Sequence, residues 1–252
     1  MKISCVIPAF ERLDLLARCL QSALDQGDAV AEIIVTDDTR GTGVRDYLSA
    51  RNDPSGLVRY AAGPRTGNPV DNWNRGLDLA QAEVRVLAHH DEWFLDRGFF
   101  GKALERFRDR EVCAVIGGVA VRAVDRPSRF ALGRGLATVL GRPRALLPLL
   151  NWIGPTAAFV FRGESHRFDP ALQQLVDVDF YRRILGSDPA VLLPGIAVAS
   201  LGHHPGQITA RIAPLAAARR DLRVLRARRP AGIGPVGFGV IDSCLRVGQW
   251  IR

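Results

Sequence analysis

The first half of the chain alternates short apolar runs with segments whose apolar residues recur at helical spacing. Apolar runs, several of them rich in β-branched residues, predict strands at residues 2–7, 32–36, 57–61, 84–88 and 112–121. Helical spacing predicts helices at residues 13–24, 43–50 and 70–81. Because strands and helices alternate in such short units, the pattern predicts an α/β fold, a mostly parallel sheet with helices on both faces.

The second half is less regular. It predicts a strand at residues 156–161, a short helix at 179–185 and a strongly basic helix at 215–229. Residues 125–150 are rich in Arg, Gly, Pro and Leu, a composition that fits a loop plus an amphipathic helix. With neither an internal repeat nor a linker, we expect one continuous domain over residues 1–210, followed by a basic helical extension at 211–252.

Composition and charge narrow the classes of ligand. Apolar residues make up 47% and charged residues 24% of the chain, which excludes a disordered or fibrous protein. The formal net charge of +8 suits phosphorylated ligands, an anionic membrane or nucleic acid. Nucleic acid ranks last, because no RNA-binding motif, zinc-finger spacing or helix-turn-helix pattern accompanies the arginines. The first strand is followed by neither GxGxxG nor GxxxxGK[ST], which disfavours NAD and P-loop chemistry.

The cysteines and the apolar stretches bear on location. Cys5, Cys19, Cys113 and Cys244 are scattered, without a CxxC pair, and are best interpreted as small buried hydrophobic residues in a reduced setting. The amino terminus lacks the apolar region of a signal peptide, and no stretch reaches the roughly 20 apolar residues of a spanning helix. We therefore expect a cytoplasmic protein that at most lies on the inner face of the membrane.

Acidic residues follow two of the predicted strands. Asp37 and Asp38 come after the strand at 32–36, and the sequence HHDEW comes after the strand at 84–88. Ligands of open parallel sheets bind beyond the carboxyl ends of the strands. Acids gathered there repel one another, and a divalent cation that also binds a diphosphate would relieve that cost. The competing interpretation is that such acids cap the next helix, as Asp91 or Asp96 could do near Leu95.

The order of motifs resembles family 2 glycosyltransferases with the GT-A fold. The pieces that carry the resemblance are ISCVIPAFER, IIVTDDTRGT, NWNRGLDLAQAEVRVLAHHDEWF, NWIGPTAAFVFRG, FDPALQQLVDVDFYRRI and HHPGQIT, which span roughly residues 2–210. The resemblance implies transfer of a sugar from a nucleotide diphosphate to an acceptor hydroxyl, with inversion and with Mn²⁺ or Mg²⁺. It also implies a nucleotide-sugar half at about 1–120 and an acceptor half at about 121–210.

Most site residues are implied by this resemblance. Those expected to bind the nucleotide sugar are Pro8, Ala9, Glu11, Asp37, Asp38, Asn74, Arg75, His90 and Asp91. The metal would be held by Glu92 with Asp91 and His204, and the acceptor would meet Trp152, Gly154, Pro155 and Thr156. The chain departs from the family where His90 replaces the first acid of the DxD motif and Gly202 replaces an arginine. Histidine can ligate a metal but cannot supply the lost negative charge.

Asp177, in LVDVD, matches the acid that takes the acceptor proton in the family. That chemistry needs a carboxylate within hydrogen-bond reach of the attacking hydroxyl, opposite the departing diphosphate. The alternative is that Asp177 caps the following helix. If the helix begins between Asp177 and Asp179, then Asp179 is expected to be its cap or a partner of Arg182.

Three alternatives remain open. A non-catalytic nucleotide-sugar-binding protein of the same fold is favoured by the altered DxD motif. A nucleotidyltransferase would share the α/β sheet, but PAFER lacks the glycine-rich loop expected after its first strand. The basic helix at 211–229 either packs on the domain, which we prefer, or touches an anionic membrane. Partners of the transferase would be the donor and a glycan or lipid-linked acceptor, in envelope polysaccharide or glycoconjugate synthesis.

Overall fold

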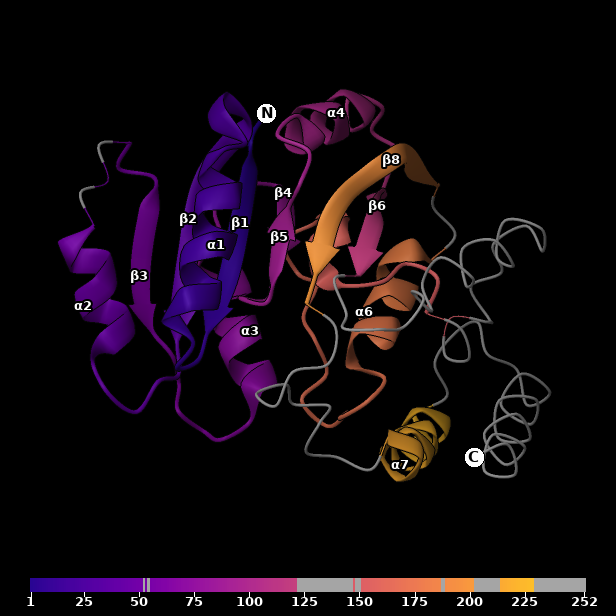
Figure 1. Cartoon of the computed structure of the whole chain (residues 1–252). Helices are drawn as coiled ribbons and strands as arrows, with labels where there is room; N and C mark the ends of the chain where they lie inside the picture. Colours follow the sequence, from indigo (N-terminus) through magenta and orange to yellow (C-terminus); the bar gives the residue numbers. More distant parts are fainter. Residues whose placement is uncertain are drawn as a thin grey trace.

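The described strands form a single sheet. The computed structural model describes residues 1–51, 53, 55–121, 147, 151–186, 189–201 and 214–228. Its eight strands run in the order β3-β2-β1-β4-β7-β6-β8-β5 (Figure 1). Their bounds are β1 Ile3–Ala9, β2 Val30–Asp37, β3 Val58–Ala62, β4 Val84–Leu87, β5 Glu92–Phe94, β6 Ala114–Val121, β7 Phe159–Arg162 and β8 Ala190–Ser200. The helices are α1 Leu13–Leu24, α2 Gly43–Ala50, α3 Pro69–Leu79, α4 Phe99–Arg106, α6 Val176–Leu185 and α7 Pro214–Ala227, with short 3₁₀ turns at η1 Gly27–Ala29 and η3 Thr156–Ala158.

The sheet is mostly parallel, as the sequence predicts. Strands β1 to β4 pair in parallel, and so do β6 and β8. Strand β7 is antiparallel to both β4 and β6, and β5 is antiparallel to β8. Both expected halves of the domain therefore contribute to one continuous sheet, and the boundary expected near residue 120 falls at the end of β6.

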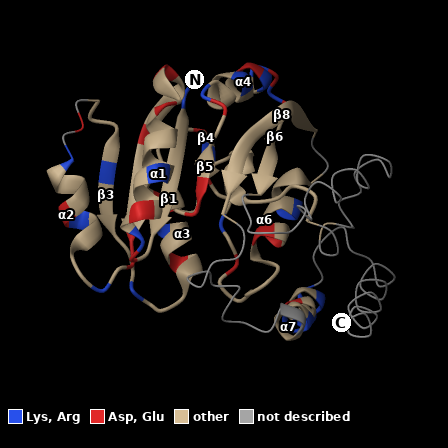
Figure 2. Ribbon diagram, in the orientation of Figure 1, with Lys and Arg blue, Asp and Glu red and all other residues tan. Residues whose placement is uncertain are grey.

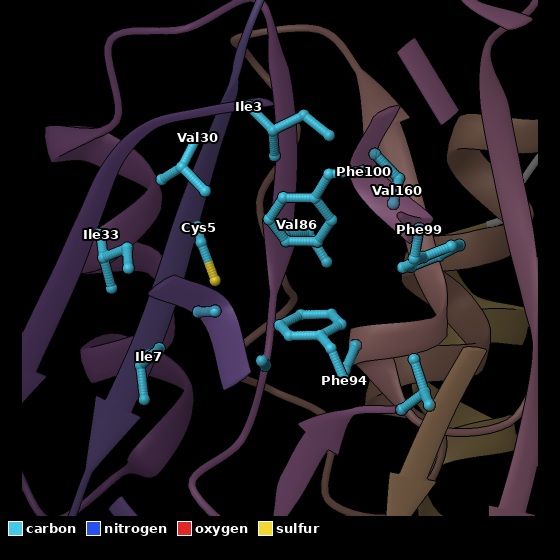
Figure 3. Close-up of a cluster of buried hydrophobic side chains, with 14 of the residues drawn as sticks. Ile3, Cys5, Ile7, Val30, Ile33, Val86, Phe94, Phe99, Phe100 and Val160 are labelled. Carbon is cyan, nitrogen blue, oxygen red and sulfur yellow. The ribbon is translucent and has the colours of Figure 1, made fainter. Parts of the chain in front are cut away.

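Hydrophobic clusters on the two faces of this sheet hold the helices. Alternation along β1 sends Ile3, Cys5 and Ile7 to the face that packs α1 and α4 (Figure 3). Val6 faces the other cluster, to which α3, α6 and α7 contribute Trp73, Phe180 and Leu222, among others. The prediction of helices on both faces is confirmed. Cys5 and Cys19 are fully buried free thiols, as expected, whereas Cys113 is half-buried and Cys244 lies outside the described residues. Trp73 and Trp93 are also buried.

Two local predictions about β1 and α4 need correction. The first strand does not stop at Pro8 but continues to Ala9. Its pairing with β4 ends at Val6, and the carbonyl of Pro8 faces His90 on that side, so no ladder requires an N–H there. Helix α4 was not predicted; the carboxylate of Asp96 accepts from the backbone N–H of Gly98 (2.9 Å) just before it. The N-cap residue of α4 is Gly98 and no side chain caps the helix, so Asp96 holds the turn before α4 and the capping interpretation is wrong for it.

Strands β5 and β8 were also missed. Strand β5 has only three residues, too few for a periodic pattern. Strand β8 contains Pro194 and Gly195, residues that ordinarily interrupt strands, and Gly195 has a positive φ of 81°. Its register with β6 shifts beside Gly118, where an added Cβ would lie 1.8 Å from the carbonyl oxygen of Gly195. An irregularity of the sheet thus accommodates residues that look like breakers in the sequence.

The basic segment packs on the domain in its described part. Helix α7 buries Ala217, Ala218, Leu222 and Leu225, whereas Arg220, Arg223 and Arg226 are exposed. Basic residues colour much of this helix in Figure 2. The preferred interpretation of this helix is confirmed for residues 214–228. In the part of the chain that the structure describes, no helix has the length and apolar character needed to span a membrane.

Two helical glycines allow a matched test of the packing between α3 and β1. A Cβ added at Gly76 would lie 2.2 Å from Cγ1 of the buried Val6, whereas one added at Gly101 of α4 would meet nothing within 4 Å. We expect Gly76→Ala to destabilise the protein by about 1 to 3 kcal/mol through overpacking. Gly101→Ala should stabilise it by roughly 0.5 to 1 kcal/mol, because alanine favours the helix. Urea unfolding measures both; a Gly76→Ala protein as stable as the wild type would contradict the close packing.

Candidate functional site

The acids that end β2 differ in exposure. Asp37 is fully buried, and its carboxylate accepts hydrogen bonds from the backbone N–H of Thr39 (2.8 Å) and from the hydroxyl of Tyr60 (3.3 Å). Asp38 is half-buried and accepts from the backbone N–H of Arg65 (3.0 Å). Behind it, a Cβ at Gly63 would lie 2.2 Å from the Asp38 carboxylate, so only glycine leaves room for it. Asp38 is thus the acid better placed to meet a ligand.

The loop after β1 lies against the loop after β2. Pro8 and Ala9 are the last two residues of β1 and are buried, while Glu11 is exposed and has a positive φ of 59°. Its backbone N–H donates to the hydroxyl of Thr39 (2.9 Å), which joins the two loops. The residues expected at the nucleobase therefore lie together at the carboxyl edge of the parallel strands.

The histidines after β4 are held by neighbouring elements. His89 lies edge-on to the ring of Trp73, with centroids 4.5 Å apart, and burial lowers its pKa to about 4. It is therefore a neutral, packed side chain near pH 7. Nδ1 of His90 lies 3.3 Å from the carbonyl oxygen of Pro8. The segment HHDEW is thereby tied to the end of β1.

Glu92, the first residue of β5, is only 4% exposed. Its Oε2 accepts hydrogen bonds from the backbone N–H of His89 (3.2 Å), the hydroxyl of Thr156 (3.2 Å) and the backbone N–H of Ala157 (2.9 Å). Burial, followed by the charges of Asp91 and Asp177, raises its pKa well above the usual value. One oxygen of the expected metal ligand therefore already has three internal donors, which anchor the turn before β7.

Asp177 lies in the first turn of α6, which begins at Val176. The helix predicted at residues 179–185 therefore begins three residues earlier, and Asp177 lies within it. Asp179 pairs with Arg182 (3.4 Å), as expected, and more closely with Arg183 (2.7 Å). Such i,i+3 and i,i+4 pairs are typical of helices.

The Asp177 carboxyl is in an unusual environment. Its Oδ1 is buried and has no hydrogen-bond partner. Burial and then the charge of Asp91 raise its pKa to about 7. The residue at the N-cap position of α6 is Leu175, and no side-chain cap is formed there by Asp177. The capping alternative for Asp177 therefore has no support in the structure, whereas a pKa near 7 is suited to proton transfer.

A buried tyrosine, Tyr181, lies within the electrostatic influence of Asp177 and Glu92 and is hydrogen-bonded to the turn before β7. The hydroxyl of Tyr181 donates to the carbonyl of Gly154 (3.1 Å), and its pKa is raised by burial and then by the charges of Asp177 and Glu92. Asp91, Glu92, Asp177 and Tyr181 thus form one electrostatic cluster, drawn from the β4–β5 turn, β5 and α6. Sequence reasoning missed Tyr181, since tyrosines at helical spacing are ordinary core residues.

The residues expected to meet the acceptor form a buried turn. Gly154 has a φ of 103°, and its backbone N–H donates to the side chain of Asn151 (3.0 Å). Thr156 donates to Glu92, as described above, and Pro155 is buried beside it. Trp152 is 4% exposed and belongs to the core cluster with α6. The turn supports the carboxyl cluster from within, and its contact with an acceptor stays a prediction.

The two residues expected from α3 differ in surroundings. Both ends of the Asn74 amide are bonded to the backbone of Phe168, with its Nδ2 donating to the carbonyl (2.9 Å) and its Oδ1 accepting from the N–H (2.8 Å). Arg75 is exposed. Asn74 therefore fixes the segment before α6 against α3, and nucleotide binding by either residue stays a prediction.

Of the three expected metal ligands, the structure describes Asp91 and Glu92. His204 and Gly202 lie outside the described residues, as do His203 and most of the segment 125–150. Among the described residues, no group of three or more His, Cys, Asp or Glu side chains is arranged to hold a metal ion. Asp91 and Glu92 are neighbours, and the charge of Asp91 contributes to the raised pKa of Glu92.

Carboxylates at the carboxyl edge of a mostly parallel sheet, beside the half-buried Asp177 on a later helix, are typical of α/β proteins that bind ligands across the ends of their strands. Residues 4–162 match glycosyl transferase family 2. The chain belongs to this family. That membership supports the expected fold and does not support the nucleotidyltransferase alternative.

A curated relative and several solved structures are similar to the chain. The Uncharacterized protein MT1568 of Mycobacterium tuberculosis (strain CDC 1551 / Oshkosh) is 27% identical over 209 residues, which are 76% of this chain and 64% of that protein. S. aureus TarS 1-349, solved in complex with UDP-GlcNAc, has a TM-score of 0.68 at 13% identity, over 97% of this chain and 71% of its own. The mannosyltransferase PcManGT from Pyrobaculum calidifontis, solved with GDP-Man and Mn²⁺, has a TM-score of 0.65 at 18% identity, over 96% of this chain and 68% of its own. These structures share the GT-A fold with this chain.

The raised pKa of Asp177 makes stability depend on pH. As pH rises from about 4, the unfolded chain releases this proton before the folded chain does. The free energy of unfolding therefore falls by up to about 4 kcal/mol by the time pH passes 7. Asp177→Asn has no proton to lose, so its melting temperature relative to the wild type should rise between about pH 4 and pH 8. Thermal unfolding in the presence of a chelator measures this difference.

Asp179→Asn is the matched control, because it removes a buried carboxylate that is paired with arginines. It should lower the melting temperature at about pH 8. A melting-temperature difference between Asp177→Asn and the wild type that stays constant with pH would contradict the assigned environment.

Proposed function

We propose that the protein is an inverting glycosyltransferase that moves a sugar from a nucleotide diphosphate to an acceptor hydroxyl, with Asp177 as the catalytic base. One observation carries this proposal: an oxygen of Asp177 is buried without a partner, in a carboxyl group whose pKa is about 7. A general base works best when its pKa lies near the working pH. Membership of glycosyl transferase family 2 supports the reaction class.

The proposed chemistry is a single displacement at the anomeric carbon. The acceptor oxygen forms a bond to that carbon while the bond from the carbon to the diphosphate oxygen breaks. The hydroxyl proton passes to the carboxylate of Asp177, and the electron pair leaves with the diphosphate. Because the nucleophile and the leaving group occupy opposite faces of the sugar, the configuration inverts.

The buried setting of Asp177 favours this proton transfer. Desolvation and the charge of Asp91 make its carboxylate a stronger base than an exposed aspartate. Oδ1 has no hydrogen-bond partner within the protein and the residue as a whole is half-buried, so an acceptor hydroxyl would supply a hydrogen bond that the protein does not. Glu92 does not compete for this role, because its Oε2 is already bonded to three donors.

The donor would lie along the carboxyl edge of β1, β2 and β4. Asp38, Glu11 and the backbone around Pro8 would face the nucleoside, while His90 and Asp91 would lie nearer the ribose and diphosphate. TarS was solved with UDP-GlcNAc and PcManGT with GDP-Man, which supports a nucleotide sugar as the donor class. A glycan or lipid-linked acceptor, a cytoplasmic location and a contact of residues 211–252 with an anionic membrane stay predictions.

Mn²⁺ or Mg²⁺ is the proposed cofactor. The donor set fits by charge, because neighbouring carboxyl groups raise the pKa of Glu92 and a bound cation would offset that repulsion. Asp91 would be the principal ligand, with Glu92 and His204 as further ligands. When bound, the ion would neutralise charge on the departing diphosphate. The complex of PcManGT with Mn²⁺ supports this proposal.

A non-catalytic nucleotide-sugar-binding protein is the second candidate. It is favoured by His90, which replaces the first acid of the DxD motif and whose ring nitrogen faces the carbonyl of Pro8. Both candidates would bind a nucleotide sugar, and only the transferase would need the carboxylate of Asp177 for turnover.

The transferase assignment predicts a loss confined to chemistry in Asp177→Asn. Its rate of nucleoside diphosphate release from a donor sugar should fall at least about 10²-fold, because removing a general base costs about that much. Nucleotide affinity, measured by calorimetry, should stay within about twofold. Gln173→Ala, an exposed change just before α6, is the control and should keep the wild-type rate. Undiminished turnover in Asp177→Asn would refute the assignment.

The metal proposal predicts that Mn²⁺ strengthens binding of a nucleoside diphosphate. We expect a gain of about tenfold or more in the wild type, because the cation offsets the charge of both the diphosphate and the carboxylates. Asp91→Asn should lose most of this gain, whereas Asp28→Asn, an exposed change in η1, should keep it. Titration calorimetry with and without Mn²⁺ measures the effect, and equal affinities in the wild type would favour the non-catalytic candidate.

A further inference from the structure

The backbone that leads into α6 is held by a side chain from α7. Oδ2 of Asp221 accepts hydrogen bonds from three consecutive backbone N–H groups, those of Gln173 (2.9 Å), Gln174 (2.7 Å) and Leu175 (2.9 Å). Asp221 is fully buried. It is also the single acid of residues 211–229, a segment rich in arginine. A buried acid in so basic a segment is expected to have a structural role.

The start of α6 has no cap of its own. Its N-cap residue is Leu175, whose side chain has no oxygen to accept a bond. Buried backbone N–H groups left without acceptors are costly, and the positive end of the helix dipole favours a carboxylate. Asp221 supplies both the acceptor and the charge, in bonds of the stronger, charge-assisted kind. The three N–H groups bonded to Asp221 precede Val176, the first residue of α6, so the backbone that enters this helix is held by an element 46 residues further along the chain.

Other contacts of α7 strengthen the same attachment. The guanidinium of Arg220 donates to the carbonyl of Ala171 (2.9 Å), and Arg228 forms an ion pair with Asp169. Leu222 and Leu225 of α7 belong to the hydrophobic cluster that also contains Phe180 of α6. In Figure 1, α7 lies beside the end of α6 that begins the helix. The segment 169–175 is thus fixed at several points from one side.

Asp177 follows this fixed segment by two residues. Because its Oδ1 has no hydrogen-bond partner, that oxygen is positioned through the backbone of the first turn of α6 rather than through a bond of its own. A shift of the first turn would therefore move the carboxylate directly. Displacements of about 1 Å in a reacting group can cost about 10²-fold in rate.

We propose that Asp221 is a positioning residue of the transfer reaction, which holds the first turn of α6 from α7 so that the Asp177 carboxylate faces the acceptor hydroxyl. This inference rests on the proposed role of Asp177. It makes α7 a part of the site's framework, although every described residue expected to touch a ligand lies before it in the sequence.

The test compares Asp221→Ala and Asp221→Asn in the full chain. Asp221→Ala should lower kcat for nucleoside diphosphate release about 10- to 100-fold, while KM for the donor stays within about twofold. Asp221→Asn keeps an oxygen that can accept part of the bonds, so its kcat should lie between those of Asp221→Ala and the wild type. Amide hydrogen exchange at residues 173–175 should be faster in both variants, most of all in Asp221→Ala.

Two controls separate positioning from a loss of stability. Leu20→Ala creates a cavity on the opposite face of the sheet and should lower the melting temperature without changing kcat below the transition. Arg223→Ala removes an exposed charge from α7 and should change neither quantity by much. A change in the donor KM alone, or equal falls in kcat for Asp221→Ala and Leu20→Ala, would overturn the positioning role.

The outcomes also separate this inference from the proposed function. Wild-type kcat in Asp221→Ala, together with an inactive Asp177→Asn, would overturn the positioning role and leave Asp177 as the base. Full turnover in Asp177→Asn would overturn the proposed function, and the positioning role with it. If Asp221→Ala does not fold, the order of kcat and of exchange rates in Asp221→Asn and the wild type decides the question.

Discussion

Burial of several carboxyl groups close to one another is the constraint on which the site depends. Water screens charges efficiently, and the fold removes it from Glu92 and Asp177 while keeping Asp91 nearby. Three responses to this cost are visible. Glu92 gathers internal donors, the Asp177 carboxyl binds its proton more tightly, and Tyr181 holds its own proton while bonded to Gly154. Each response makes the local structure more dependent on protonation and on bound cations.

The net charge of the chain is opposite in sign to the buried charges of the site. The chain carries a net charge of +8, yet the buried charges of the site are largely acidic. Arginines in α6 and just after α7 pair with acids of α6 and of the segment before it, as Arg183 does with Asp179 and Arg228 with Asp169. Basic residues therefore hold acids of the framework in place without taking part in the proposed reaction.

Much of the fold could be predicted from the sequence because periodicity reports burial on each face. Helix α1 has the predicted bounds, and β1 differs only at its ends, since alternation and spacing dominate there. Strand β8 could not be predicted, because its Pro194 and Gly195 depend on a bulge that only pairing with β6 defines. In the candidate site, Asp177 was singled out by its motif, and its catalytic role stays a prediction. Asp221 was not singled out, since its contacts are with backbone N–H groups of a distant segment, which no local pattern reveals.

The distant origin of the carboxylate that holds residues 173–175 also bears on the order in which the protein matures. During synthesis, residues 173–175 leave the ribosome well before Asp221 does, and at about 5 to 20 residues per second the delay is several seconds. Through that interval the sheet can already pair β1 with β2, β3 and β4, since those contacts lie within the first 90 residues. A nascent chain would thus have the parallel strands β1 to β4 in place while the backbone that leads into α6 still lacks its acceptor. Completion of α7 would be the step that turns a folded sheet into a working site.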